Sequence, residues 1–368
     1  MHPGTRNDNA VDFWRGFALV TIFVNHIPGN IYSYATIRNF ALSDAAELFV
    51  LLAGWSTSYA TGGPHKPDPA RRVAFRLLSR AVEIYRAQVV ISAIALAMLA
   101  GMAIQRANPL FLEWHNAAVA FYDPVRAAVG SVLLTYQLSY FNILPLYVAL
   151  LVLAPALVVI ARRSLVAVLS ASLALYLWAL VTQTSLPSWP SENSWYFNPL
   201  CWQLLFVCGF AAAEFGERSP RAADLARRAV PYAAAVVVAG LAVRLVEYWP
   251  DPLSVPEPRL LFLFDKTYLS PARLVSVLAI AMAFHGVHGF LGPRIGPVSR
   301  YLCALGRNSL AVFSVASLLS LGGQLIRFVA GGGIFVDTCM VVSGIWLLGL
   351  TAWFVEWRSR PHPPSRLR

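Results

Sequence analysis

An arginine and a histidine lie eleven residues apart in a stretch that is otherwise apolar enough to enter a membrane. The stretch, residues 12–30, reads DFWRGFALVTIFVNHIPGN and contains Arg15 and His26. Eleven residues make about three turns of an α-helix, so both side chains share one face of a predicted helix, about 16 Å apart along its axis. Ionisable groups within a membrane span are costly and are commonly functional. The pair therefore offers a fixed cation at one depth and a titratable imidazole at another.

Two carboxylates begin the next apolar stretch, which opens SDAAELFVLLAGWS. Asp44 and Glu47 are three residues apart and share a helix face. Glu47 and His26 are expected at matching depth, each about five residues from the outer end of its span. A carboxylate beside His26 would fix the imidazole tautomer and raise its basicity, as a general base requires. A pair that only holds two helices together is the alternative interpretation.

Three arginines after the second of these spans repeat every four residues. Arg72, Arg76 and Arg80 form a cationic stripe on one face of a predicted helix whose other face is apolar. Such a helix either faces solvent or lipid headgroups or binds the phosphates of an anionic cofactor on the cytoplasmic side. Both interpretations stay open at this point.

Two loops predicted on the opposite side have another character. Segment 183–198 reads QTSLPSWPSENSWYFN and has no Lys or Arg, and segment 249–273 mixes acids, prolines and aromatic residues. Aromatic rings stack on the apolar faces of sugars while amides and carboxylates bind the hydroxyls. The loops therefore favour a sugar-binding surface, with an interfacial aromatic belt as the alternative.

The histidine and cysteine residues give only weak indications of a metal-binding or redox site. His285 and His288 have a spacing that can bind metal, but no carboxylate or cysteine lies near them in the sequence, so a structural role is predicted. The four cysteines all fall in apolar runs without ligand spacing, which predicts buried free thiols. No metal site is predicted; the cysteines are Cys201, Cys208, Cys303 and Cys339.

The composition predicts the elements that carry these residues. Of 368 residues, 58% are hydrophobic and 13% charged, whereas a soluble protein carries about 25% charged residues. A spanning helix needs about 20 apolar residues. Ten segments qualify, near 12–31, 42–60, 86–105, 139–160, 165–182, 198–214, 230–248, 272–290, 305–328 and 334–356. The sequence predicts an all-α, polytopic integral membrane protein of about ten transmembrane helices, in one domain over 1–368. The interval 106–138 has room for a short interfacial helix.

The charges predict the orientation. With a cytoplasmic N-terminus, 21 of the 29 Lys and Arg residues fall on the cytoplasmic side and 8 on the other, as expected for a membrane protein. Both termini are therefore predicted to be cytoplasmic. The same distribution explains the net charge of +11 without nucleic acid, so membrane lipid is the expected surrounding and nucleic acid is excluded as a partner. No cleavable signal peptide is apparent.

The motifs resemble a known family. Arg15, ten intervening residues and His26 form the Arg-X10-His pattern that marks the first span of the acyltransferase 3 family of membrane acyltransferases. Further blocks resemble its OpgC branch, which places succinyl groups on osmoregulated periplasmic glucans. They read SDAAELFVLLAGWS, YQLSYFNILPLYVALL, SWYFNPLCWQLLFVCGF, DKTYLSPAR and LGRNSLAVFSVASLLSLGGQL, and together they cover nearly the whole chain. One departure is Ala53, where a serine is common, so any contribution of that hydroxyl is absent.

The resemblance implies a ten-span fold in the bacterial inner membrane, a cytoplasmic acyl-CoA donor and a periplasmic sugar hydroxyl as acceptor. For the OpgC branch the donor is succinyl-CoA, used as a substrate; no bound cofactor is implied. On this interpretation His26 takes the proton from the hydroxyl, oriented by Glu47 and Asp44, while an acyl-histidine intermediate stays possible. The donor would meet Arg15 near its pantetheine and the predicted cationic stripe at its phosphates.

The acceptor, a periplasmic glucan or another envelope polysaccharide, would meet the two outward loops. The candidates for this surface are Trp195, Tyr196, Asn198, Asp265, Lys266 and Tyr268. If the acyl group is succinyl, Lys266 or Arg273 could bind its free carboxylate. The alternative function is a transporter or flippase for an envelope saccharide or an anionic solute, although no internal repeat of the kind common in transporters is visible.

Overall fold

The computed structural model describes residues 9–191 and 193–360, and these are almost entirely helical. The all-α prediction is confirmed. The principal helices are α1 Ala10–Asn25, α2 Ala45–Ala60, α3 Ala70–Gln105, α4 Ala118–Tyr122, α5 Pro124–Val132, α6 Ile143–Arg163, α7 Leu165–Thr182, α8 Pro199–Arg218, α9 Ala222–Leu245, α10 Pro271–Ala283, α11 Val287–Leu291, α12 Gly296–Arg307, α13 Ser309–Ala330 and α14 Ile334–Arg358. Short 3-10 helices are η1 Ile31–Ala35, η2 Ile37–Asn39, η3 Pro109–Asn116 and η4 Arg259–Leu261. Strands β1 Pro187–Ser188 and β2 Asn193–Ser194 pair antiparallel.

Nine of the ten predicted spans lie largely within a single helix, and the predicted span 272–290 covers the two helices α10 and α11. In the described part of the chain, eight helical segments are long and apolar enough to cross a membrane, which identifies a multi-pass membrane protein. Helices α1 and α2 have 16 residues each, fewer than the 18 residues of the shortest of these eight segments. The number of ten spans and the orientation therefore stay predictions. Arg6, Arg366 and Arg368, which contribute to the orientation, lie outside the described residues.

The chain forms two compact units. The first contains α1 and helices α11 to α14, from the stretches 1–33 and 287–368, and the second contains α2 to α10, within 34–286. The prediction of a single domain stays a prediction. The units are described separately below.

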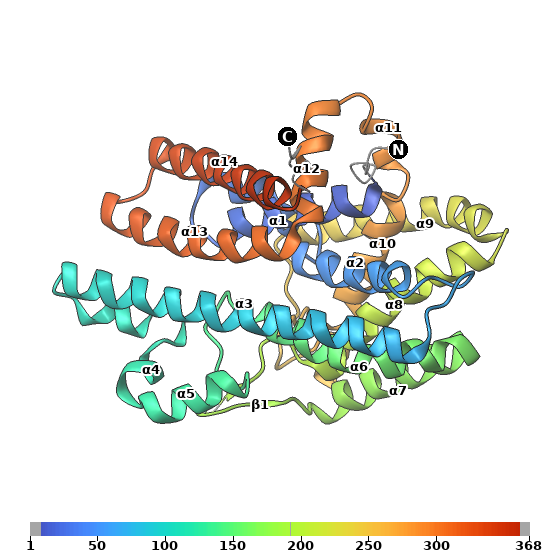
Figure 1. Cartoon of the computed structure of the whole chain (residues 1–368), viewed down its shortest axis with the longest axis horizontal. Helices are drawn as coiled ribbons and strands as arrows, with labels where there is room; N and C mark the ends of the chain where they lie inside the picture. Colours follow the sequence, from blue (N-terminus) through green and yellow to red (C-terminus); the bar gives the residue numbers. More distant parts are fainter. Residues whose placement is uncertain (1–8, 192, 361–368) are drawn as a thin grey trace, which may run out of the picture. The chain divides into compact units, whose positions relative to one another are not determined.

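In the first unit, α1 packs along α12 and α13 packs along α14 (Figure 1). Glycines make the first pairing close. A Cβ atom on Gly16 would lie 1.9 Å from the Leu302 carbonyl oxygen, and one on Gly306 would lie 1.9 Å from the Asp12 carbonyl oxygen. Small residues let helix backbones approach in this way in membrane proteins.

The second unit contains an equally close pair, α2 and α8. A Cβ on Gly54 would lie 1.9 Å from the Phe206 carbonyl oxygen, and one on Gly209 would lie 1.9 Å from the Leu51 carbonyl oxygen. Helix α8 also packs on α7, and α9 packs on α10. The core of this unit thus forms around α2, whose two ends carry the candidate site residues.

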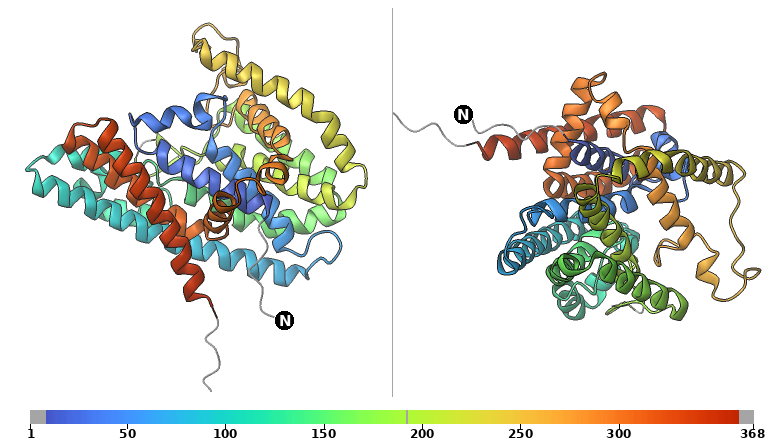
Figure 2. Two further views of the ribbon diagram at one scale, coloured as in Figure 1. Left: turned by 90° about the horizontal axis from the view of Figure 1, so that it is seen from above. Right: turned by 90° about the vertical axis from the view of Figure 1, so that its right-hand side faces the viewer.

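Helix α3 is a continuous rod of 36 residues that packs along α6 (cyan in Figure 2). It begins at Ala70, so the predicted span 86–105 is the second part of a longer helix. Residues 70–85 are amphipathic rather than apolar, yet they continue the same buried stripe, with Val73, Leu77 and Ala81 buried at every fourth position. The predicted cationic helix and the span are therefore one element.

Two other stretches refine the predictions. The interval 106–138 contains η3, α4 and α5, so the expected short helix exists there in three pieces. The predicted span 305–328 is preceded by a separate amphipathic helix, α12, which ends at Arg307. The break falls at Asn308, whose Nδ2 donates to the Ala304 carbonyl at 2.9 Å and to Glu356 Oε1 at 3.1 Å.

Candidate functional site

The N-terminus of α2 is built around two carboxylates. Asp44 is the N-cap residue, and its Oδ1 accepts a hydrogen bond from the Ala46 N–H at 2.8 Å. Glu47 reaches back, and its Oε2 accepts from the Asp44 N–H at 3.1 Å. This reciprocal arrangement is a capping box, which satisfies helix N–H groups that have no partner within the helix. Glu47 is completely buried, so its charge needs further partners.

Those partners come from the loop that precedes α10 and from its first turn. Arg273 donates from Nε to Glu47 Oε1 at 2.8 Å and also donates from Nη2 to the same oxygen. Lys266 Nζ donates to Asp44 Oδ2 at 2.5 Å, and Arg273 Nη2 lies 3.8 Å from that oxygen. Two carboxylates thus face two cations, and we call Asp44, Glu47, Lys266 and Arg273 the α2 charge cluster.

Two members of the α2 charge cluster lie outside the helices, and both stay ionised at neutral pH. Burial would raise the pKa of the Asp44 carboxyl, but Lys266, Glu47 and Arg273 outweigh it and hold the pKa well below its usual range. Burial would lower the pKa of Lys266, and the carboxylates of Asp44 and Glu47 outweigh it and raise that pKa. Both partners of the Lys266–Asp44 bridge are therefore charged near pH 7.

The loop that carries Lys266 is held in place through its main-chain carbonyl groups. Trp202 Nε1 donates to the Lys266 carbonyl at 3.0 Å and to the Thr267 carbonyl at 3.1 Å. Within the loop, the Tyr268 N–H donates to Asp265 Oδ1 at 2.7 Å. Asp265, a predicted acceptor residue, is thus used to shape the turn that presents Lys266.

The second predicted loop, 183–198, meets the first. Asn198 is the N-cap of α8, its Nδ2 donates to the Thr184 carbonyl at 2.8 Å, and its N–H donates to the Thr267 carbonyl at 3.2 Å. Tyr268 donates from its hydroxyl to the Gln183 carbonyl at 2.6 Å. Asn198 is completely buried, so its visible role is to join the loops.

Only part of the predicted acceptor surface is open. Trp195 is buried, whereas Tyr196 is 46% exposed. Lys266 Nζ lies 6.0 Å from the ring centroid of Tyr196 and 5.6 Å from that of Phe197. All six predicted acceptor residues belong to the second unit, and one of them, Lys266, is a member of the α2 charge cluster. Tyr196 is exposed, and Asp265, Lys266 and Tyr268 are partly exposed.

Two further contributors were not predicted as site residues. Arg244 at the end of α9 donates from Nε to the Ala41 carbonyl at 2.9 Å, and its guanidinium lies 4.6 Å from the centroid of the Trp249 ring. Ser43 and Ser276 are both buried, and their hydroxyl oxygens are 3.1 Å apart. The position of Arg244 at the outer end of a predicted span could have indicated that it belongs to the site. Nothing in the sequence indicates the contact between Ser43 and Ser276.

The opposite end of α2 meets the arginine stripe of α3. Asp68 accepts hydrogen bonds from Arg72 Nη1 at 2.9 Å and from Arg76 Nη1 at 2.7 Å, and the Arg72 bond leads the causes that lower the Asp68 pKa. Arg76 also donates to the Ala60 carbonyl at the end of α2. Arg80 Nη1 lies 2.7 Å from Glu83 Oε2. The stripe is exposed and partly neutralised by these acids.

The first unit contains Arg15 and His26. Helix α1 includes Arg15 and ends at Asn25, and His26 is its C-cap residue, with its N–H donating to the Ile22 carbonyl at 3.0 Å. The predicted span continued to residue 31, but Pro28 and the left-handed Gly29 (φ 78°) follow the cap and stop the helix. The helical spacing between Arg15 and His26 is retained. The predicted contact of His26 with Glu47 would join the two units and stays a prediction.

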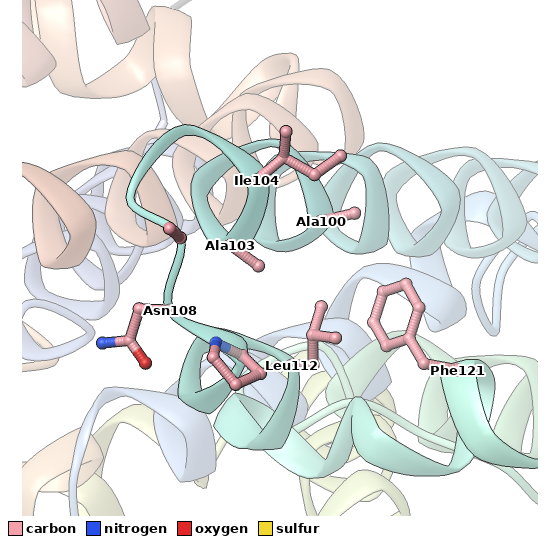
Figure 3. A pocket seen from close by; sticks show the side chains of 8 residues that line it. Ala100, Ala103, Ile104, Asn108, Leu112 and Phe121 are labelled. Atoms are coloured by element: carbon pink, nitrogen blue, oxygen red, sulfur yellow. The ribbon is translucent and has the colours of Figure 1, made fainter.

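Three features lie apart from these residues. The His288 ring packs 5.0 Å from that of Phe13, in keeping with a structural role. The prediction of four buried thiols is confirmed for Cys201 and Cys303, but Cys208 is only half-buried and Cys339 is exposed. Cys339 is exposed because one face of α14 is not covered by other helices of its unit. A cavity of about 400 Å³ lies between the end of α3 and the segment η3–α4 (Figure 3) and is apolar except for Asn108. It contains none of the predicted site residues.

The helices and the buried charges define a multi-pass α-helical membrane protein with ionisable clusters near the helix ends. The model of the OpgC protein family matches residues 7–360, and the chain belongs to this family. Membership indicates a membrane-associated acyltransferase that modifies glucans. Searches among curated proteins and among solved structures gave no significant match.

Proposed function

We propose that the protein is an inner-membrane O-acyltransferase that moves an acyl group, succinyl in the first instance, from cytoplasmic acyl-CoA to hydroxyl groups of a periplasmic glucan. The family match over 7–360 supports the reaction class. The donor, the acceptor and the direction across the membrane are parts of the proposal.

The observation that carries the direction is the placement of two charged surfaces at opposite ends of α2. The α2 charge cluster lies at its N-terminus, beside Tyr196, and the arginine stripe is tied to its C-terminal carbonyl at Ala60. A helix of 16 residues separates them by about 24 Å. An exposed arginine stripe suits the phosphates of a nucleotide donor, and a lysine beside exposed aromatic rings suits a sugar.

The chemistry is assigned to His26. Its imidazole takes the proton of the glucan hydroxyl while the oxygen attacks the thioester carbonyl carbon. The carbon–sulfur bond then breaks, and the proton passes from the imidazolium to the departing thiolate, which leaves as CoA. The products are a glucan ester and free CoA, and His26 is neutral again. Arg15, on the same face of α1 as His26 and about 16 Å away along the helix axis, is assigned to the pantetheine arm.

Glu47 and Asp44 are assigned to the acceptor side in this scheme. Each already has a cationic partner, Arg273 for Glu47 and Lys266 for Asp44. A carboxylate has about four acceptor positions, so Glu47 can accept a further hydrogen bond from a histidine without losing Arg273. If the acyl group is succinyl, Lys266 is the more accessible of the two cations for its free carboxylate, because the Lys266 side chain is 23% exposed and that of Arg273 is 6% exposed.

The test uses purified protein in lipid vesicles, supplied with succinyl-CoA, acetyl-CoA or no donor and with periplasmic glucans as acceptor. Mass spectrometry of the glucans should show a mass step of one acyl group per site, with CoA released in equal amount. His26→Ala and Arg15→Ala should abolish the step while the protein still inserts and remains folded. Full activity in either variant would contradict the assignment of that residue.

The same vesicles separate the alternative function. Movement of glucan across the bilayer without a change in its mass would favour a transporter or flippase. Transfer from acetyl-CoA alone would retain the enzyme and replace the donor. Glucans unchanged with every donor would move the acceptor to another envelope polysaccharide.

A further inference from the structure

The turn that follows His26 is bound by one arginine from α13. Arg327 donates from Nη1 to the Pro28 carbonyl at 3.0 Å and from Nη2 to the Gly29 carbonyl at 2.5 Å. The planar guanidinium thus binds two successive carbonyls of the turn with two parallel donors, a geometry that lysine cannot reproduce. Gln324, one helical turn earlier on α13, donates from Nε2 to the carbonyl of His26 itself at 2.5 Å.

The same arginine is held by an aspartate from α14. Asp337 accepts from Arg327 Nε through Oδ1 at 2.9 Å, and its other oxygen, Oδ2, accepts from the Ile31 N–H at 3.2 Å. Asp337 is 3% exposed and lies in the first turn of α14, where the helix dipole favours a negative charge. One carboxylate therefore fixes both the arginine and the far end of the turn.

The turn and the connection between the two helices are shaped to allow these contacts. Gly29 has φ 78°, and a Cβ atom there would lie 2.4 Å from Arg327 Nη1, so no side chain fits beside the guanidinium. Gly331, Gly332 and Gly333 all have positive φ, which side chains disfavour. They make the short reversal that places Arg327 at the end of α13 opposite Asp337 at the start of α14.

We infer that Arg327 and Asp337 are positioning residues that clamp residues 28–31 and thereby fix the place of the His26 imidazole. The role in catalysis rests on the proposed function of His26; the clamp itself does not. His26 is the last cap residue before this turn, so the turn decides how α1 ends and where the ring points. Misplacement of a catalytic group by about 1 Å costs about a hundredfold in rate, which makes such a clamp effective without any contact to substrate.

The first measurement is hydrogen exchange of the whole protein in lipid nanodiscs. Mass spectrometry then gives the exchange rate of the peptide that spans residues 27–33. Asp337→Asn and Arg327→Lys should both accelerate exchange in this peptide about tenfold or more. Asp337→Asn removes the charged acceptor of the Ile31 N–H, and Arg327→Lys removes the guanidinium that holds this acceptor in place. The matched control is Glu356→Gln. Glu356 pairs with Arg307 at the other end of α14, at 3.1 Å. Its substitution should leave the exchange rate of the 27–33 peptide unchanged.

The second measurement is turnover with acyl-CoA. Arg327→Ala and Asp337→Asn should lower kcat about 10- to 100-fold and leave KM for acyl-CoA within about twofold, because neither residue contacts the donor. Added guanidinium ion at millimolar concentration should restore part of the kcat of Arg327→Ala and none of that of Asp337→Asn. A smaller fraction of folded protein would also lower the apparent kcat at unchanged KM, but added guanidinium would not restore it. Gly29→Ala retains both charged residues but displaces the guanidinium, and it serves as the test if Arg327→Ala does not fold.

The results separate the clamp from the enzyme. Unchanged exchange in 27–33 in all these variants would overturn the clamp. Faster exchange with unchanged kcat would overturn its role in positioning His26. If the native protein shows no acyl transfer with any donor, the proposed function fails, and the exchange comparison still decides whether the clamp exists.

Discussion

Arg273 in the first turn of α10 donates from Nε to Oε1 of Glu47 in the first turn of α2, at 2.8 Å, and the two side chains are 6% and 0% exposed. This ion pair joins residues 226 positions apart in the chain. Glu47 also forms the capping box of α2 with Asp44. A local helix-capping motif and a long-range contact thus share one carboxylate.

The first prediction concerns this pair. Arg273→Met should lower the free energy of unfolding by about 3–5 kcal/mol, because it leaves the Glu47 charge buried without its main partner. Adding Glu47→Gln to that variant should recover a large part of the loss, since a neutral amide needs no counter-charge. The measurement is the unfolding free energy of the native protein, both single variants and the double variant in the same detergent or lipid. Additive effects in this cycle would show that the two side chains do not interact.

The second prediction is a pH dependence of the Lys266–Asp44 bridge. The folded-state pKa of Asp44 is lowered from its ordinary value of 3.8, so the stability it contributes is present above that value and is lost as the pH falls through the folded pKa. The pKa of Lys266 is raised from 10.5, so its contribution is complete below that value and is lost as the pH rises through the folded pKa.

The stability difference between the native protein and Asp44→Asn should accordingly be constant from about pH 5 to pH 9. It should shrink below about pH 4, as the unfolded chain begins to bind the proton, and again above about pH 10.5, where Lys266 of the unfolded chain loses its proton. Thermal unfolding midpoints of both proteins across this range provide the measurement. A difference that changes steeply between pH 5 and pH 8 would mean that a different group titrates there.

The predictions from the sequence succeeded where the signal was local. Continuous apolar runs located the eight long apolar helical segments of the described residues, and the arginine spacing at 72–80 identified a helical face that α3 indeed presents. The pattern Asp44-x-x-Glu47 is itself a capping-box signature, and it explains why the helix begins at Ala45. Its use as a cap was visible in the sequence, although the carboxylates were interpreted only as partners of a histidine.

What the sequence could not show is which distant groups meet. Arg273 was considered only as a ligand for a substrate carboxylate, whereas its guanidinium is engaged by Glu47. Asp265 and Asn198 were expected on the acceptor surface, and the structure shows that both also hold loops in place. Polar residues in loops look alike whether they bind a ligand or the backbone, because both uses require the same donors and acceptors.

The third prediction uses the close packing of α2 and α8. Gly54→Ala and Gly209→Ala each place a Cβ 1.9 Å from a backbone carbonyl oxygen of the facing helix, so the helices must separate. Each variant should lower the free energy of unfolding by about 1–3 kcal/mol or more and should also lower turnover, because α2 carries a candidate site at each end. The readouts are an unfolding curve and acyl transfer by the same preparation.

Gly216→Ala is the matched control for this prediction. Gly216 lies on α8 as Gly209 does, but a Cβ there meets nothing within 4 Å. The substitution should be neutral or should stabilise the helix by up to about 1 kcal/mol, since alanine is the better helix former. Equal losses in Gly209→Ala and Gly216→Ala would show that the effect comes from α8 itself and not from its contact with α2.

The last prediction concerns the arginine stripe as a donor site. Arg72 and Arg76 share Asp68, and Arg80 faces Glu83, so each arginine can exchange a carboxylate for a phosphate. Exposed pairs of this kind are worth less than about 1 kcal/mol, and the exchange is therefore easy. Arg72→Gln and Arg80→Gln should each raise KM for acyl-CoA about 3- to 10-fold and leave kcat nearly unchanged.

Glu83→Gln gives the opposite test of the stripe, because it removes the acid that competes with the donor for Arg80. It should lower KM for acyl-CoA by a factor of about 2 and make it more sensitive to salt, since an exposed cation is screened more than a paired one. The measurement is KM at low and high ionic strength for the native protein and the three variants. If no variant changes KM in either direction, the stripe does not bind the donor, and its exposed apolar face, with Phe75 76% exposed, would indicate that α3 here contacts the lipid surface.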